Sequence, residues 1–341
     1  MSRTAVITGL VLILGHLASP AASPPRFEKV SDHFYFLQPK TDASNVGAMV
    51  TDSGVLLINP PTEPDLPPVL DALRRLTQRS VRWVVHTDYQ KEQAGGSSYF
   101  VMRGAQRLSS KDLRRLAALP SLSAEAKPDK DAKKPSSEMQ TAKAASPEEM
   151  RDNPASLPDI LFGRQMRLYP DGVEVRLFAL QQKAHTGCDV VVYLPAEKVL
   201  QVGDMYMTGS YPEIDMGEGA GSALGWLDGL KHVIETVPLL KTAIPPRTEA
   251  EKAAKAALEE KSLEELVAVI PARGPRSNLK EMKALLESAQ KVRAEIARAV
   301  AAGRSRDTVL SLPSLGPYRI NLNFDVFAGR LFDELTQARE K

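Results

Sequence analysis

The feature that most constrains how this chain can fold is an apolar run, residues 81–85, followed almost directly by a polar stretch that ends in two glycines. Residues 81–85 have the sequence Val-Arg-Trp-Val-Val, which is typical of a buried strand. The ten residues from Thr87 then have the sequence Thr-Asp-Tyr-Gln-Lys-Glu-Gln-Ala-Gly-Gly. Proteins with α/β folds commonly place their chemistry outside the carboxyl ends of their strands. The stretch therefore predicts a functional site at the end of a strand.

The same stretch resembles the signature loop of the metallo-β-lactamase superfamily, Thr-His-x-His-x-Asp-His-x-Gly-Gly. Thr87, Gly95 and Gly96 match its frame. The four metal-binding positions of the family fall on Asp88, Gln90, Glu92 and Gln93. In the family, imidazoles and a carboxylate at these positions hold one or two zinc ions that activate a water for hydrolysis. Since all three histidines are replaced here, the resemblance implies a degenerate metal site.

Three later motifs resemble the same family. The first is His185-Thr186-x-x-Asp189, and the second is Gly203-Asp204 at the end of a predicted strand. The resemblance implies that His185 corresponds to a ligand of the first metal and that Asp204 corresponds to the aspartate that ligates or bridges the metals. The third is the loop 271–275, which resembles the family's final Pro-Gly-His-Gly loop. It carries Arg273 where the family has a histidine of the second metal.

The remaining donor set is rich in oxygen. Zinc prefers thiolate and imidazole ligands, whereas Asp88, His185 and Asp204 would suit manganese, magnesium or calcium better. Arg273 carries a fixed positive charge, and buried carboxylates need a compensating cation. We therefore expect the Arg273 guanidinium to pair with Asp204 or Glu92. The sequence predicts no bound cofactor, with one weakly bound divalent metal ion as the alternative.

Other side chains near these motifs have more ordinary expected roles. His86 alternates to the opposite face from Thr87, so we expect a packed or solvent-facing histidine rather than a metal ligand. Cys188 could form a nucleophilic pair with His185, although a small residue at the start of a buried strand is more often packed. Tyr89 and Lys91 are expected to be exposed loop side chains. Trp226 is expected in the core.

The predicted elements follow the order of the family fold. Strands are expected within 27–37, 45–50, 54–58, 81–85, 166–169, 173–178, 190–194, 199–204 and 266–270. Helices are expected at 66–75, 104–120, 223–234, 249–266, 279–300 and 325–339. With the motifs, this order implies an α/β (α+β) fold, the four-layer αββα metallo-β-lactamase sandwich with a C-terminal helical extension.

Five segments are predicted along the chain. Residues 1–22 have the charge, apolar run and small-residue cleavage site of a signal peptide, so we expect a secreted or periplasmic protein without a membrane span once the signal is removed. Residues 121–158 are rich in Ala, Lys, Glu, Ser and Pro and are expected to be a disordered insertion, or alternatively a docking arm. The halves of the fold are expected at 27–120 and 159–275, and the C-terminal helical extension at 276–341.

Three functions are compatible with these residues. The first is an exported pseudoenzyme that binds a small-molecule or protein ligand. The second is a metal-dependent hydrolase, β-lactamase-like or thioesterase-like, with a residual mononuclear site. The third is a metal-free hydrolase that uses Cys188 and His185. The net charge of +2, without a basic stripe interleaved with aromatics, argues against a nucleic-acid partner.

Overall fold

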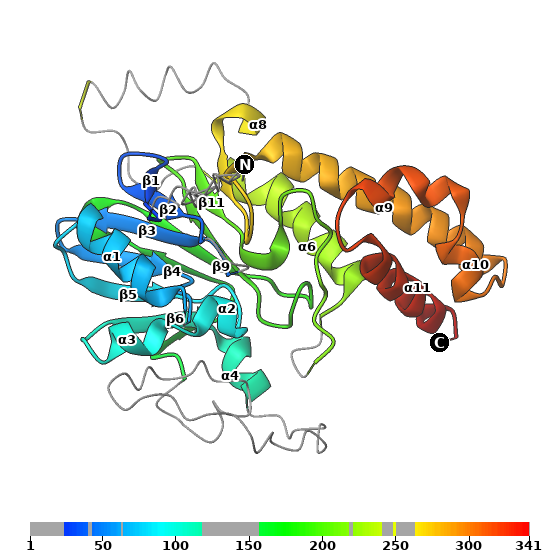
Figure 1. Cartoon of the computed structure of the whole chain (residues 1–341), viewed down its shortest axis with the longest axis horizontal. Helices are drawn as coiled ribbons and strands as arrows, with labels where there is room; N and C mark the ends of the chain where they lie inside the picture. Colours follow the sequence, from blue (N-terminus) through cyan, green and yellow to red (C-terminus); the bar gives the residue numbers. More distant parts are fainter. Residues whose placement is uncertain are drawn as a thin grey trace, which may run out of the picture.

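Two β-sheets packed face to face form the centre of the molecule (Figure 1). The computed structural model describes residues 24–39, 43–62, 64–117, 157–217, 221–240, 248–249 and 263–340. The first sheet has seven strands in sequence order, and the second has six in the order β13-β12-β11-β10-β9-β8. A core cluster between the sheets joins Phe34 and Leu56 of the first sheet to Val175 and Val192 of the second.

The first sheet is built from strands whose apolar residues face both sides. Its strands are β1 (Glu28–Lys29), β2 (Phe34–Leu37), β3 (Val46–Thr51), β4 (Gly54–Ile58), β5 (Val81–Val85), β6 (Gln106–Ser110) and β7 (Ile160–Phe162). Its helices are α1 (Leu66–Leu76), α2 (Lys91–Ala94), α3 (Ser97–Val101) and α4 (Lys111–Ala117). Helix α1 begins at Leu66 and has two prolines in its first turn, where a helix tolerates them, and it buries Leu66, Val69 and Leu73 against the sheet.

The second sheet carries the C-terminal helices on its outer face. Its strands are β8 (Gln165–Leu168), β9 (Val175–Ala179), β10 (Val190–Leu194), β11 (Val199–Gln201), β12 (Ala268–Ile270) and β13 (Ser277–Asn278). Its helices are α6 (Ala223–Thr236), α8 (Leu263–Leu266), α9 (Leu279–Ala301), α10 (Arg306–Leu310) and α11 (Phe324–Glu340). Short 3₁₀ helices lie at η2 (Pro170–Gly172), η3 (Gly203–Met205), η4 (Val237–Leu239) and η5 (Pro313–Ile320). These layers confirm the predicted αββα order.

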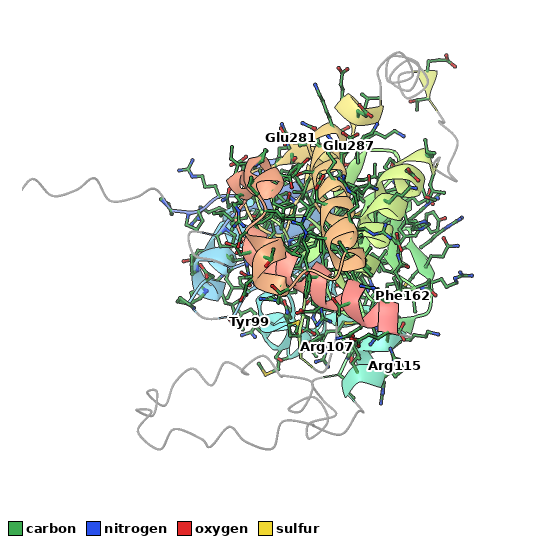
Figure 2. All side chains as sticks on the ribbon, turned by 90° about the vertical axis from the view of Figure 1, so that its right-hand side faces the viewer. Tyr99, Arg107, Arg115, Phe162, Glu281 and Glu287 are labelled. Atoms are coloured by element: carbon green, nitrogen blue, oxygen red, sulfur yellow. The ribbon has the colours of Figure 1, made fainter. Side chains whose placement is uncertain are left out.

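The C-terminal helical extension packs against α6 on the outer face of the second sheet. Figure 2 shows α9 and α11 in front of the sheets, with Glu281 and Glu287 on α9. Phe327 of α11 stacks on Tyr211 with ring centroids 4.9 Å apart and meets Trp226 edge-on at 5.3 Å. Trp226 is fully buried, as expected, and its ring nitrogen donates to Met205 O at 2.9 Å. This contact fixes α6 against the short helix η3.

One predicted helix is wrong. Residues 104–120 were expected to be helical, but 106–110 form the parallel strand β6 and only 111–117 form a helix. Leu108 faces the core between the sheets, whereas Arg107 is buried on the outer face and pairs with Asp159. Because the outer face of this strand is polar although it is buried, the apolar alternation of a strand is weak in the sequence.

The boundary between the two halves of the fold also differs from the prediction. Strand β7 lies after the undescribed residues 118–156, yet it pairs in parallel with β6, with Leu108 opposite Ile160. The first sheet therefore extends to Phe162, beyond the boundary predicted at 159. The signal segment 1–22, most of the insertion 121–158 and most of the helix predicted at 249–266 lie outside the described residues. None of the helices in the described part of the chain is long and apolar enough to cross a membrane.

We expect Glu334→Ala to lower the free energy of unfolding by about 2 kcal/mol, since it removes a carboxylate that satisfies the start of α6. Glu334 accepts from Ser222 Oγ and Ala223 N, each at 2.8 Å, and from Leu224 N at 3.1 Å. Urea unfolding measures the change. Glu340→Ala, at the exposed end of the same helix, is the matched control and should change stability by less than about 0.5 kcal/mol.

Candidate functional site

The loop after β5 is fixed by the side chain of the residue that directly follows the neighbouring strand β4. Asn59 adopts a left-handed backbone conformation (φ 55°) directly after β4. Its amide nitrogen donates to Thr87 Oγ1 at 2.9 Å, and its amide oxygen accepts from Thr87 N at 3.0 Å. At Gly96, a Cβ atom would lie 2.2 Å from Pro61 O, so only glycine allows this close approach of the two chains. The frame residues of the signature loop therefore keep a structural role.

Three predicted site residues come together beneath this loop. One ligand atom each of Asp88, His185 and Asp204 lies within 4.8 Å of the other two, and all three side chains are buried. Asp88 follows β5, His185 precedes β10 and Asp204 follows β11 within η3. Three strand ends from two sheets thus converge on one point, which we call the carboxylate–histidine cluster.

Asp88 is a carboxylate of the cluster whose pKa is raised by its burial. Its Oδ1 accepts from Gln90 N at 2.8 Å, whereas its Oδ2 is buried without a hydrogen-bond partner among the described residues. Burial raises the pKa of Asp88 to about 7; the nearby His185 opposes this rise and Asp204 adds to it. The charged form of Asp88 is therefore costly unless a cation lies beside it.

His185 is surrounded by carboxylates. Its Nδ1 lies 3.6 Å from Asp88 Oδ2 and 3.6 Å from Asp189 Oδ1, which is too long for a hydrogen bond. Burial lowers the pKa of His185, but Asp189, Asp88 and Asp204 outweigh burial and hold this pKa well above its usual range. Asp189 was not predicted as a site residue. It also accepts from Thr186 N and Thr186 Oγ1, which fixes the turn that presents His185.

The side-chain amide of Gln93 contacts the carboxylate–histidine cluster. The Gln93 side-chain nitrogen donates to Asp204 Oδ2 and to Ser44 Oγ, the latter at 2.9 Å. Its amide oxygen is buried and has no hydrogen-bond partner among the described residues. Ser44 comes from the loop before β3, 49 residues away in the sequence, so sequence spacing gave no signal for it. Gln90 is half-buried, and the side chains of Lys91 and Glu92 lie outside the described part of the structure.

The predicted ion pair between Arg273 and Asp204 is not observed. Arg273 Nη1 donates to Met207 Sδ at 3.9 Å, and its Nε is buried without an acceptor among the described residues. The loop backbone is held on both sides, because Asn45 Nδ2 donates to Pro271 O and Gly274 O while Thr208 N donates to Arg273 O. This anchoring leaves the guanidinium beside Met207. A pairing with Glu92 involves a side chain outside the described ones.

Tyr89 is buried, contrary to the expected exposed position. It packs with Leu113, Leu116 and Cys188 in a small core cluster. Its hydroxyl donates to Asp215 Oδ2 at 2.6 Å, and Asp215 N donates to His185 O at 2.9 Å. Tyr89 therefore ties the signature loop to the segment that covers His185.

Cys188 has a packing environment. Its side chain is fully buried, and burial with the neighbouring Asp189 and Asp88 raises the thiol pKa well above its usual value. A buried thiol that resists ionisation is a poor nucleophile. These observations oppose the metal-free hydrolase that would use Cys188 and His185.

His86 is packed, as the sequence predicts. Both ring nitrogens are buried without a hydrogen-bond partner among the described residues. Burial lowers the pKa of His86 to about 3, and the nearby Arg107 lowers it further while Asp159 opposes. His86 is neutral at ordinary pH and is not part of the carboxylate–histidine cluster.

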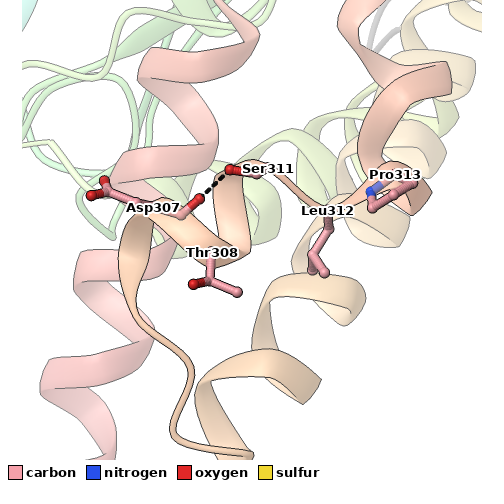
Figure 3. A pocket seen from close by; sticks show the side chains of 5 residues that line it. All are labelled: Asp307, Thr308, Ser311, Leu312 and Pro313. Carbon is pink, nitrogen blue, oxygen red and sulfur yellow. Dashed lines mark hydrogen bonds between the residues drawn. The ribbon is translucent and has the colours of Figure 1, made fainter.

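Two surface hollows lie on the helical side of the molecule. One, of about 490 Å³, is lined by Asp307, Thr308, Ser311, Leu312 and Pro313 (Figure 3). The other, of about 530 Å³, lies between α6 and α9. No residue of the carboxylate–histidine cluster lines either hollow. The cluster is a buried centre, and these hollows are separate from it.

Comparison with known proteins identifies the architecture. No family model and no curated protein matches the sequence. Among solved structures, a metallo-β-lactamase from Pontibacter korlensis is similar at 17% identity and a TM-score of 0.52, covering 78% of this chain and 99% of the other. The DIM-1 metallo-β-lactamase exposed to ceftazidime is similar at 15% identity, with a TM-score of 0.50 and coverage of 78% and 98%.

A third similar structure is the metallo-β-lactamase FIM-1 from Pseudomonas aeruginosa in its mono-zinc form. It is 14% identical, with a TM-score of 0.50, and the match covers 80% of this chain and 98% of FIM-1. At such identities the likeness concerns the fold, and it agrees with the two sheets and flanking helices described above. The chain therefore has the fold of the metallo-β-lactamase superfamily, as its motifs predict, together with a C-terminal helical extension.

Proposed function

We propose that this chain is an exported, ligand-binding protein of the metallo-β-lactamase fold whose carboxylate–histidine cluster holds one oxygen-preferring divalent cation. We further propose that it does not carry out two-zinc hydrolysis. The observation that carries this proposal is the meeting of Asp88, His185 and Asp204 within 4.8 Å. Buried carboxylates gathered in this way need positive charge, which the protonated His185 supplies in part and which a bound divalent cation would supply in its place.

A zinc pair does not fit the residues that are present. Gln90 and Gln93 offer neutral amides where imidazoles would be needed, and Arg273 brings a fixed positive charge to the position of a second-metal ligand. The Gln93 amide nitrogen also donates to Asp204, which uses one oxygen of a remaining ligand. The residues present therefore do not support hydrolysis by a pair of metal ions.

One cation does fit. Asp88 Oδ2 and His185 Nδ1 are both buried without hydrogen-bond partners among the described residues, and a cation bound there would replace the proton that the carboxylates favour on His185. The three ligand atoms lie within 4.8 Å of one another, which is close enough for one ion with bonds to oxygen of about 2.4 Å to contact all of them. Two carboxylates and one imidazole favour manganese, magnesium or calcium over zinc.

A second candidate is a β-lactamase-like or thioesterase-like hydrolase with a mononuclear site. It is favoured by the position of the cluster at the carboxyl ends of β5 and β11, where folds of this type place their chemistry. A single bound cation would supply Lewis-acid polarisation of a substrate oxygen. The residues of this chain would bind and orient that ion, with Gln93 holding one oxygen of Asp204.

The two candidates differ in turnover. We expect the purified protein, given Mn²⁺, Mg²⁺, Ca²⁺ or Zn²⁺, to hydrolyse nitrocefin and a thioester no faster than its Asp204→Asn variant, because the residues for a two-metal water are replaced. Asp228→Asn, exposed on α6, is the matched control. Cation-dependent turnover that is lost in Asp204→Asn and kept in Asp228→Asn would replace the binding role with the hydrolase.

Export is checked by the mass of the exported protein, which should begin near Ala22.

A further inference from the structure

We infer that Tyr89 and Asp215 are positioning residues that hold Asp88 and His185 at the spacing at which one cation can contact both. We call the hydrogen bond between their side chains the Tyr89–Asp215 brace. The inference rests on the proposed function, because it concerns the same carboxylate–histidine cluster. Among the described residues, neither Tyr89 nor Asp215 contributes a ligand atom to that cluster, so both act through the residues they hold.

Asp88 and His185 do not fix each other. Asp88 Oδ2 and His185 Nδ1 lie 3.6 Å apart, which is too long for a hydrogen bond, and neither atom has a hydrogen-bond partner among the described residues. Asp88 lies in the loop after β5, and His185 lies in the loop before β10. The spacing of the two side chains therefore depends on contacts between these two loops.

The bases of the two loops are joined. Val190 N, at the start of β10, donates to Thr87 O at 2.7 Å. A backbone hydrogen bond from Tyr89 also reaches the thiol of Cys188. On the second loop these contacts lie three and five residues beyond His185, so they do not hold the backbone of His185 directly.

The Tyr89–Asp215 brace supplies the contact at His185. Tyr89 OH donates to Asp215 Oδ2 at 2.6 Å, and Asp215 N donates to His185 O at 2.9 Å. A hydrogen bond from a hydroxyl to a carboxylate is roughly twice as strong as one between neutral groups. Asp215 Oδ1 accepts from Gly217 N at 2.9 Å, which orients the carboxylate. The brace thus joins the residue next to Asp88 to the backbone of His185, across 126 positions of the sequence.

The packing of Tyr89 suits this role. Its side chain is buried and contacts Leu113, Leu116 and Cys188 in a small core cluster. A packed aromatic ring has few alternative rotamers, so its hydroxyl is held in one place. Groups that orient metal ligands in this way typically contribute about 10- to 100-fold to metal affinity. Loss of the brace is therefore expected to weaken cation binding without removing a ligand.

The test is a chelator-competition titration of the full chain with Mn²⁺. Tyr89→Phe should weaken Mn²⁺ binding by about tenfold or more, because the ring keeps its packing while the brace is lost. The double variant Tyr89→Phe/Asp215→Ala should bind no more weakly than Asp215→Ala alone, since both changes remove the same bond. Asp215→Asn should retain part of the affinity, because its amide oxygen still accepts from Tyr89 OH.

The matched control is Tyr193→Phe. It also removes a buried tyrosine hydroxyl, which donates to Pro238 O at 3.2 Å, but it lies outside the carboxylate–histidine cluster and should bind Mn²⁺ like wild type. A general loss of stability would weaken Mn²⁺ binding in both variants. An effect confined to Tyr89→Phe and rescued in part by Asp215→Asn identifies the positioning role.

Hydrogen exchange in chelator separates this inference from the proposed cation site. Tyr89→Phe should speed exchange of the Asp215 amide, whose acceptor is His185 O, and Tyr193→Phe should not. Equal Mn²⁺ affinity in wild type and Tyr89→Phe, or equal exchange of the Asp215 amide, would overturn the inference. Failure of the wild type to bind Mn²⁺ would contradict the proposed cation site, and the exchange rates would still show whether the brace holds the loop.

Discussion

Asp88→Asn is expected to stabilise the metal-free protein at pH 8 by roughly 2–4 kcal/mol and to abolish its stabilisation by a divalent cation. Burial raises the pKa of Asp88 to about 7, above the value of an unfolded aspartate near 3.9. The stability contributed by its protonated form is fully present below pH 3.9 and is lost as the pH rises through 7. At pH 8 the fold therefore holds a costly charge, which asparagine removes while its side-chain oxygen still accepts from Gln90 N.

Urea unfolding in chelator and in Mn²⁺ measures both effects. The wild type should gain about 2.7 kcal/mol at a cation concentration of a hundred times the dissociation constant, and the variant should gain none. Asp228→Asn, exposed on α6, should behave like wild type in both conditions. If Asp88→Asn were less stable than wild type in chelator at pH 8, the carboxylate would already have a partner within the protein.

His86→Leu is expected to protect the fold against acid, by about 3 kcal/mol relative to wild type at pH 4. Burial lowers the pKa of His86 to about 3, whereas an unfolded histidine titrates near 6.5. The stability contributed by its neutral form is present above pH 6.5 and is lost as the pH falls toward 3. Leucine has no proton to take up and fills much of the same buried space, so this loss disappears.

Unfolding as a function of pH checks this prediction, with His232→Leu as the control. His232 lies on the exposed side of α6, so its replacement should leave the pH dependence unchanged. The two buried groups change the free energy of unfolding in opposite directions as the pH falls from 6.5 to 4. Protonation of Asp88 in the folded state raises it, and protonation of His86 in the unfolded state lowers it. Relative to wild type, Asp88→Asn should therefore lose its advantage over this range while His86→Leu gains one. Parallel pH curves for both variants would contradict the two buried environments.

The motifs predicted the fold well because they record backbone requirements. Gly96 has to be glycine, because a Cβ atom there would lie 2.2 Å from Pro61 O. Thr87 is held by a hydrogen bond from Asn59 that involves no metal. Such residues keep these backbone roles independently of the side chains at the metal-binding positions that the resemblance implies. The apolar strands were recognisable for the same reason, since both faces of β4 and β10 are buried.

The sequence was less informative where a polar side chain is buried by distant partners. The strand β6 was predicted as helix because Arg107 is buried through its contact with Asp159, which lies 52 residues away. The hydrogen bond from Gln93 to Ser44 was not predicted, because Ser44 lies in the loop before β3, 49 residues away in the sequence. Arg273 was expected to pair with Asp204 or Glu92, and the pair with Asp204 is not formed because the anchored loop 271–274 places the guanidinium beside Met207. The pairing with Glu92 stays a prediction, since that side chain lies outside the described ones. In each case a contact between distant segments decides the outcome.

Metal stoichiometry of the purified full chain tests the central claim most directly. After exhaustive chelation, the protein is titrated with Mn²⁺, Ca²⁺ and Zn²⁺ and the bound metal per chain is measured by mass spectrometry and calorimetry. We predict one equivalent of an oxygen-preferring cation, absent in Asp204→Asn and unchanged in Asp228→Asn. Two tightly bound zinc ions per chain would contradict the account.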